Sequence, residues 1–543
     1  MAETYKTVEV KPHPSATNNT GMEDDPVGKD YESSLRDVEM TDTVLRRVPG
    51  PIPWILFLIC VIEFGERFVY IGINGPLQNY IQHPFPHDSK GVPGALGRGQ
   101  ATGTALGDFL KFWSYLCTVF GAILADQYLG KFKTIIVSSP VYITGLVLLV
   151  ATATPVAIQN NVAFGGLVAS MILIGLGTGG LKACIAPMCG EQSLEQSSKQ
   201  ITLKSGEIVI EDGKLTSARI FMWYYWAANI GALSSLVTVS VEKEHSFWLA
   251  YLIPLIVFLI VLTIFVSFSK NIVKVPARGS ALVDAYKMLT IAAKEGSMDK
   301  AKPSSLHARN RIDRYAFARL PEYTDSYVGQ IKSGLQACKY FILFPFYFLC
   351  WTQVFNNLVS QAGDMKLGGT PNDMMSNLET IFMLSFIPIL DLLVYPALRK
   401  RKINFSPILR ITMGFMCAAL AMTYACVVQH FIYENGENTL NVWIQTPGYV
   451  FSALSEIWVI ITGLEVAFIK APENLRAVVS SLFWVTIAIG AALGIALSPV
   501  SQDPYMVWTY GALAIAVFTA GIVFAIWHHE EIKFRPEILS VEE

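Results

Sequence analysis

Three ionisable residues lie close together in the first long apolar segment of the chain. Glu63, Glu66 and Arg67 are spaced three and four positions apart, so in a helix they share one face, which Tyr70 and Asn74 continue. An ionisable side chain inside a membrane span costs at least ~2.5–3.5 kcal/mol, and each one therefore needs a reason. Such groups can exchange protons and bind charged solutes. The face is expected to line a cavity rather than lipid; the alternative is a structural ion pair that holds two helices together.

A lysine ends the fourth apolar segment. Lys182 follows the small residues Gly177-Thr178-Gly179-Gly180, which permit close helix packing. A buried lysine needs a partner, and the acids of the first segment are the expected ones. The alternative is that Lys182 extends to the membrane surface.

The second half of the chain carries its own charges in apolar surroundings. Glu456 lies well within the tenth apolar segment, and Glu465 lies nearer its end and carries less weight. Lys339 is early in the seventh segment and Asp391 is in the eighth. These two are expected near the same membrane face, either as an inner gate or as a static structural pair.

The elements that must position these residues are membrane helices. The 543 residues are 52% hydrophobic and only 15% charged, whereas a soluble protein is usually about a quarter charged. About twelve apolar stretches reach the roughly twenty residues that cross a bilayer. Their approximate limits are 54–82, 102–129, 134–153, 163–189, 218–241, 247–268, 334–360, 376–398, 406–430, 444–470, 476–499 and 506–528.

The arrangement of the spans predicts an all-α membrane protein of the major facilitator fold, with two six-helix bundles around a central cavity. The predicted parts are a disordered cytoplasmic tail (1–50), a first bundle (51–269), a cytoplasmic linker (270–333), a second bundle (334–528) and a cytoplasmic tail (529–543). Residues 281–294 have helical periodicity and are expected along the membrane surface.

Lysine and arginine in the loops set the orientation. Basic residues such as Lys131, Lys133 and Arg399 alternate with poorly charged loops, which predicts that both termini are cytoplasmic in a multi-pass protein of the plasma membrane. The net charge of −2 does not suggest a nucleic-acid partner. The eight cysteines show no CxxC pair, and no P-loop or GxSxG motif occurs, so neither a metal site nor an enzyme is predicted.

Several motifs in order resemble one transporter family. Asp126 with Gly130-Lys131-Phe132-Lys133 resembles the loop D-x-x-x-G-[KR]-x-[KR] of major facilitator proteins. The segment EFGERFVYIG, from Glu63, resembles the E-x-x-E-R-F-x-Y-Y-G signature of the proton-dependent oligopeptide transporter (POT/PTR) family. YYWAANIGAL at 224–233 and EIWVIITGLEVAFIKAP at 456–472 resemble further family blocks, and NNLVSQAG at 356–363 and VWIQTPGYV at 442–450 resemble fungal members. The match runs from about 50 to 528.

The resemblance implies a function. It implies a proton-coupled symporter that imports di- and tripeptides by alternating access, driven by a proton gradient with no bound cofactor, in the lipid bilayer and as a monomer. Glu63 and Glu66 would take the coupling proton together with Arg67 and Lys182. Substrate-lining positions would be Arg67, Tyr70, Asn74, Tyr115, Lys182, Asn229, Thr352, Glu456 and Trp484, with Arg67 and Lys182 at the peptide carboxylate and Glu456 at its amino end. A second tryptophan, Trp351, would add to the walls, although ordinary helix packing explains each tryptophan as well.

A physical argument supports the coupling. A peptide is zwitterionic and needs cations at one end and an anion at the other. When its carboxylate competes for Arg67 and Lys182, a neighbouring glutamate loses its partner and binds a proton. Proton and peptide then favour each other's binding.

The sequence departs from the family at a few positions. Ile71 replaces the usual second tyrosine, and Thr352 stands where Asn, Asp or Glu is usual. Asp108 stands where animal members have a histidine, and it is expected at the extracellular membrane edge rather than as an extra titrating group. These changes keep two alternatives open, namely a proton-coupled carrier of a non-peptide or peptide-like metabolite, and a peptide sensor without transport.

Overall fold

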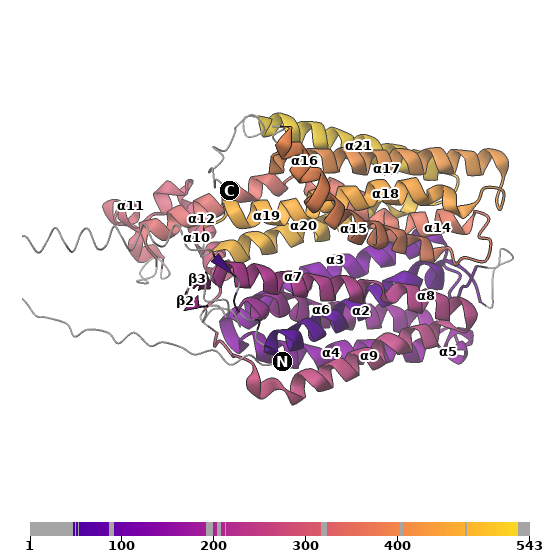
Figure 1. Ribbon diagram of the computed structural model, residues 1–543, viewed down its shortest axis with the longest axis horizontal. Coiled ribbons are helices and arrows are strands. Elements are labelled where there is room, and N and C mark those ends of the chain that lie inside the picture. Colours follow the sequence, from indigo (N-terminus) through magenta and orange to yellow (C-terminus); the bar gives the residue numbers. More distant parts are fainter. Residues whose placement is uncertain are drawn as a thin grey trace, which may run out of the picture.

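The computed structural model describes residues 47–48, 50, 52, 54–85, 92–191, 199–202, 208–211, 213–277, 279–315, 323–401, 405–472 and 475–529. Long helices form two bundles that lie side by side, one from the first half of the chain and one from the second (Figure 1). The linker helices project from one end, here called the linker end; the opposite end is the far end (Figure 1).

The first bundle contains the helices between the N-terminal strand and the linker. They are α2 (Ile55–Gln82), α3 (Gln100–Leu124) with the π-helical turn η1 (Ala125–Leu129), α4 (Lys131–Thr152), α5 (Pro155–Gln159), α6 (Ala163–Glu191), α7 (Gly213–Ala232), α8 (Ser234–Glu244) and α9 (Phe247–Ser267).

The second bundle follows the linker. Its helices are α12 (Asp325–Cys338), α13 (Phe344–Trp351), α14 (Asn357–Gly363), α15 (Asn377–Ile389), α16 (Tyr395–Lys400), α17 (Pro407–Asn435), α18 (Thr446–Glu456), α19 (Thr462–Lys470), α20 (Arg476–Leu497) and α21 (Met506–Trp527). Short 3-10 turns η6 (Lys339–Phe341), η7 (Thr352–Phe355) and η8 (Asp373–Ser376) and the π-helical turns η9 (Leu390–Val394) and η11 (Ile457–Ile461) join several of them.

The helices account for the predicted spans. In the described part of the chain, nine are long and apolar enough to cross a membrane, and the pair Asp325–Phe341 and Phe344–Gly363, bent by 46°, forms a tenth. Helix α2, which carries Glu63, Glu66 and Arg67, has 28 residues, or about 42 Å, and is also long enough to span. Helices α7 and α8 follow one another in the first bundle, and both pack against α2. The predicted all-α fold of about twelve spans in two bundles is confirmed, and the protein is a multi-pass membrane protein.

The linker is folded rather than laid on a membrane surface. The expected helix over 281–294 is present as α10 (Ala281–Glu295). Its apolar residues Met288 and Ile291 are buried with Val328 of α12 and Val478 of α20. The expectation of a membrane-surface helix is therefore wrong for this face, because the protein itself covers the apolar stripe.

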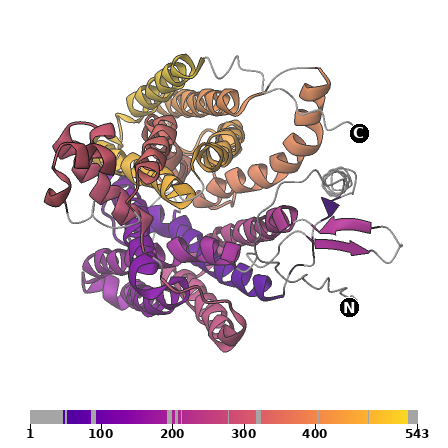
Figure 2. The same cartoon turned by 90° about the vertical axis from the view of Figure 1, so that its left-hand side faces the viewer.

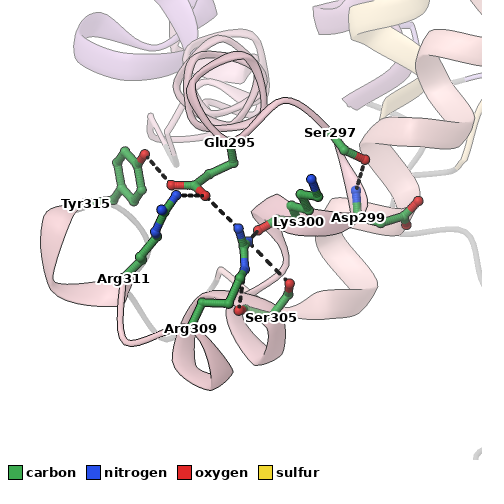
Figure 3. A network of polar contacts seen from close by, with 8 residues as sticks. All are labelled: Glu295, Ser297, Asp299, Lys300, Ser305, Arg309, Arg311 and Tyr315. Carbon is green, nitrogen blue, oxygen red and sulfur yellow. Dashed lines mark hydrogen bonds and ion pairs between the residues drawn. The ribbon is translucent and has the colours of Figure 1, made fainter.

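A polar network holds the linker together (Figure 3). Glu295 lies 2.7 Å from Arg309 Nη1 and 2.9 Å from Arg311 Nη1, and it accepts a hydrogen bond of 2.9 Å from the Tyr315 hydroxyl. These contacts, the Tyr315 hydrogen bond foremost, hold the pKa of the Glu295 carboxyl below its usual range. The end of α10 is thereby bound to the segment after α11 (Pro303–Ala308).

A small sheet departs from the all-α expectation. β1 (Arg47–Val48) pairs in parallel with β3 (Ile208–Glu211), which pairs antiparallel with β2 (Lys199–Thr202). The expected disordered tail, 1–50, lies outside the described residues except for 47–48 and 50, and two of those form β1. The expected tail 529–543 lies outside them beyond 529. Figure 2 shows the sheet beside the first bundle, viewed from the linker end.

The two bundles are joined toward the far end. Within the described residues, the hydrogen bonds between bundles connect the end of α2, the first half of α3 and α8 with α14, α21 and the loops beside η7 and η8. Examples are Gln78 to Ser360 at 3.1 Å, Thr104 to Asn357 at 2.9 Å and Asn79 to Asn372 at 2.8 Å. The conformation is thus closed at the far end.

Candidate functional site

The charged face of α2 forms a buried ion network. Arg67 Nε lies 3.0 Å from Glu63 Oε1 and 4.0 Å from Glu66 Oε2. Lys182 Nζ of α6 lies 3.7 Å from Glu66 Oε1, so the predicted partnership between Lys182 and the acids of the first span is confirmed. Glu66 is fully buried and its carboxylate oxygens accept no hydrogen bond. Among the described residues, its negative charge is therefore compensated by these two cations alone.

Glycines bring Lys182 close to α2 and α3. A Cβ on Gly179 would lie 2.5 Å from the Cys117 carbonyl carbon, and one on Gly121 would lie 2.6 Å from the Gly179 carbonyl oxygen. The backbones of α3 and α6 therefore touch, as the small residues before Lys182 predict. Without this contact, the Lys182 side chain would not reach Glu66.

Arg67 is the accessible member of the network. Its side chain is 30% exposed, whereas those of Glu63 and Glu66 are 3% and 0% exposed. Tyr224 of α7 donates a 2.6 Å hydrogen bond to Glu63 Oε2 and covers the acid from the side. A ligand would meet the guanidinium first, with both acids behind it.

Aromatic rings enclose Lys182. Its Nζ lies 3.5 Å from the centre of the Tyr70 ring and 4.9 Å from that of Tyr115, within the range of cation–π attraction. Asn74 and Asn229 each donate a side-chain hydrogen bond to the backbone carbonyl four residues earlier, at 2.7 and 2.8 Å. Both asparagines are thereby held in fixed orientations on α2 and α7.

The second bundle contributes an acid and two tryptophans. Trp351 Nε1 donates a 3.3 Å hydrogen bond to Glu456 Oε2, and Glu456 lies within electrostatic range of Arg67. Trp484 of α20 stacks on Tyr115 of α3 with ring centres 5.8 Å apart. This stack joins the two bundles beside the ion network, so the acid of the second bundle and the cations of the first belong to one region.

Other predicted site residues have different surroundings. Thr352 is fully buried and donates its hydroxyl to the Leu349 carbonyl at 3.0 Å, within its own helix turn. Lys339 and Asp391 are both exposed, and these two described residues form no ion pair with each other in this conformation. Their pairing as a gate stays a prediction. Glu465 lies 3.6 Å from Arg410, as expected of a structural pair.

Asp108 does not lie at the membrane edge. It is fully buried, accepts a 2.7 Å hydrogen bond from Asn356 Nδ2, and lies 3.6 Å from Lys111 Nζ. The expectation of an edge position is wrong because α3 packs against the second bundle there. The sequence analysis missed Lys111. The signal that could have identified it is its charge within the second apolar stretch, where an ionisable side chain is costly.

A second missed residue, an acid, lies near Glu456. Glu379 of α15 is 2% exposed and accepts a hydrogen bond from Ser452 of α18. It is within electrostatic range of Glu456 and of Lys111. Its signal was the same, an acid at the start of an apolar segment.

Comparison with known proteins agrees with this geometry. The family model described as "PTR2: POT family" matches residues 132–516. The chain belongs to the POT family. The "Probable peptide transporter ptr2" of Schizosaccharomyces pombe is 39% identical over 99% of this chain and 90% of its own length. "Peptide transporter PTR_C" of Candidozyma auris is 41% identical over 88% and 84%, and "Peptide transporter PTR2" of Saccharomyces cerevisiae is 35% identical over 94% and 84%. These relatives are named as transporters and not as enzymes.

Solved POT family structures share the fold. The POT family transporter PepTSo matches with a TM-score of 0.70 at 18% identity, covering 89% of this chain and 100% of its own. An auto-inhibited POT family peptide transporter matches with a TM-score of 0.68 at 20% identity, over 89% and 98%. The likeness confirms the two-bundle architecture of the POT members for this chain.

Proposed function

We propose that this protein imports di- and tripeptides together with protons. The observation that carries the proposal is the ion network of Glu63, Glu66, Arg67 and Lys182, set beside Glu456 of the other bundle. A zwitterionic peptide needs cations and an anion at a fixed separation, and each bundle provides one kind. The names of the fungal relatives as peptide transporters support the same substrate class.

Arg67 and Lys182 bind the peptide carboxylate in this proposal. Arg67 is reached first because it is the exposed cation, and its guanidinium suits a carboxylate. Glu456, oriented by the indole of Trp351, receives the amino end. Glu379 adds a second carboxylate on that side, which offsets the absence of an amide or carboxyl group at Thr352.

The proton enters through Glu66. In the empty site the two cations balance its buried charge, since its oxygens have no hydrogen-bond donor. A peptide carboxylate that draws Arg67 and Lys182 away leaves this charge uncompensated in a dry site, and a proton is then required. Peptide and proton bind cooperatively, and by linkage the coupling is reciprocal.

Transport proceeds by alternating access between the bundles. The loops rich in lysine and arginine favour a cytoplasmic linker end, so the far end faces outward. The conformation closed at the far end then corresponds to the inward-facing state. Lys339 and Asp391, apart here, pair in the outward-facing state and act as the inner gate. The proton gradient alone drives the cycle, and no cofactor takes part.

The decisive experiment is uptake of a labelled dipeptide into proteoliposomes with and without an inward proton gradient. We expect accumulation only with the gradient, competed by unlabelled di- and tripeptides. Glu66→Gln is expected to abolish gradient-driven accumulation while leaving peptide counterflow, and Glu434→Gln, on an exposed acid, is the matched control. Gradient-driven uptake retained by Glu66→Gln would refute the coupling role. No uptake by the folded wild type would refute the peptide assignment.

A further inference from the structure

Two buried carboxyl groups from different bundles meet at the far end. Glu242 is on α8 of the first bundle and is 2% exposed, and Asp373 begins η8 of the second bundle and is fully buried. The two carboxyls interact directly. No described side chain donates a hydrogen bond to Glu242 Oε2 or to the carboxylate oxygens of Asp373, which lie beside the backbone N–H groups of Asp373 and Met374. The pair lies well outside the ion network of Glu66 and Arg67 and is not needed for peptide binding.

The surroundings of the pair supply few compensating charges. Lys243 attracts Asp373 electrostatically, but its ammonium donates to the Gly369 carbonyl, and within the described residues it forms no ion pair with either acid. Tyr251 of α9 is buried beside the two carboxyls with its hydroxyl unpaired. Two ionised carboxylates in contact at a buried interface repel each other and are both desolvated. This arrangement is stable only if one of them carries a proton.

Side-chain amides join the two bundles beside this pair of carboxyls. Asn79 of α2 and Asn372 of the second bundle exchange two hydrogen bonds of 2.8 Å, and Asn79 Nδ2 also lies 3.3 Å from Glu242 Oε1. Glu242 is thus oriented by a donor on one oxygen while the other is directed to Asp373. A proton between the carboxyls would complete a continuous hydrogen-bonded seam between the bundles, and a charge-assisted O–H···O⁻ bond is among the stronger kinds.

The pair also has a route to solvent. Glu242 lines a small recess with about 50 Å³ of water-sized space, together with the exposed His245 and with Trp248. A proton can therefore exchange from the far end, on the side away from the ion network. Glu242 and His245 are the titratable side chains among the lining residues.

From this geometry we infer a second proton-binding site, in which Glu242 and Asp373 share one proton that fastens the far end in its closed state. The inference rests on the proposed function only for its orientation, with the far end outside. When the far end opens, the carboxyls separate and hydrate, so both ionise and the proton returns to the outer solution. Closure therefore takes up a proton from outside, and external acidity favours it. The proton never reaches the linker end, so it regulates the cycle without adding to the transported stoichiometry.

The test is hydrogen–deuterium exchange of the purified protein in lipid nanodiscs between pH 5 and pH 8, corrected for intrinsic exchange rates. Because closure takes up one proton, the ratio of closed to open far ends is expected to change by up to about tenfold per pH unit. Protection of segments 74–83 and 356–377 should therefore fall as the pH rises. Glu242→Gln keeps a donor toward Asp373, so its protection should stay high and nearly independent of pH.

Two further variants complete the design. Asp373→Asn gives the same singly charged pair from the other side and should also remove the pH dependence, which guards against one variant failing to fold. Glu244→Gln changes an exposed acid two residues along the same helix and should behave like the wild type. Equal pH dependence in wild type and Glu242→Gln would overturn the inference. Protection restored at pH 8 by Na⁺ or Ca²⁺ would also overturn it, because the site would then hold a metal cation.

This readout is independent of peptide transport. If the exchange result holds but dipeptide uptake fails, the proton site stands and the peptide assignment falls. If uptake is driven by the proton gradient but the far-end segments show no pH dependence, the second site falls alone.

Discussion

Removing the charge of Lys182 tests whether Glu66 depends on its cations. The Lys182 ammonium lies 3.7 Å from the Glu66 carboxylate, and Glu66 is fully buried without a hydrogen-bond donor. Coulomb's law at an effective dielectric constant of about 20 gives ~4.5 kcal/mol for this separation, and breaking a buried pair typically costs about 3–5 kcal/mol. Lys182→Met keeps an unbranched side chain and the contact with the Tyr70 ring but removes the charge. We expect it to destabilise the protein by about 3 kcal/mol, because Arg67 at 4.0 Å still compensates part of the charge.

A double-mutant cycle isolates the pair. The protein, Lys182→Met, Glu66→Gln and the double variant are unfolded by titrating SDS into mixed micelles, and the free energy of unfolding is compared. The double variant should lose less than the two single variants together, by about 2–4 kcal/mol, because it leaves neither charge uncompensated. Lys133→Met, on the exposed surface of α4, is the control and should change the free energy of unfolding by less than about 0.5 kcal/mol. Additive losses in the cycle would refute the reasoning, since Glu66 would then have another source of stabilisation.

Three further predictions follow from the packing and the linker. Gly179→Ala should destabilise the fold by about 1–3 kcal/mol in the same SDS titration and should lower peptide uptake, because its Cβ would lie 2.5 Å from the Cys117 carbonyl carbon. The control is Gly165→Ala, whose Cβ would meet nothing within 4 Å and which should be neutral. Trp351→Phe should raise the KM for dipeptides about tenfold and change kcat little, because it removes one hydrogen bond to the charged Glu456. An unchanged KM would argue against Glu456 as the acid that binds the amino end of the peptide. In the linker, the contacts of Glu295 lower its pKa, so their contribution to stability is present above the usual glutamate range and is lost as the pH falls below about 4. Hydrogen exchange of residues 295–315 should therefore be faster in Glu295→Gln than in the wild type at pH 7, and the two rates should become equal in acid. A difference in exchange rate that does not change with pH would contradict the ion network.

The sequence predicts most strongly where a charge contradicts its surroundings. Glu63, Glu66, Arg67 and Lys182 stand out because ionisable groups are costly inside a membrane span. In the structure, contacts of 3.0, 4.0 and 3.7 Å join Glu63 to Arg67, Arg67 to Glu66 and Glu66 to Lys182. The fold follows from the same contrast, since apolar stretches of sufficient length define the spans. Close helix packing beside Lys182 was also predictable from the small residues before it, whereas the identity of α3 as the partner helix was not.

Contacts between residues far apart in the chain could not be predicted from the sequence. The sequence alone places Asp108 at the membrane edge, because its hydrogen-bond partner Asn356 is 248 positions away in the chain. The sequence does not indicate the contact between Glu242 and Asp373 either. Each of these acids lies near the end of an apolar segment, where a carboxylate is ordinarily hydrated. The surface assignment of α10 failed similarly: an amphipathic stripe looks the same whether lipid or α20 covers it.

The placement of buried acids suggests how one chain keeps two proton equilibria apart. Glu66 is compensated by Lys182 and Arg67, so it needs a proton only when a ligand takes those cations. Glu242 and Asp373 have no such cation within the described ion pairs, so their need for a proton is set by whether the bundles are closed, not by whether peptide is present. One site thus responds to substrate and the other to conformation. A substrate-free protein at acidic pH should accordingly show a protected far end, and adding peptide should change the proton count of the ion network alone.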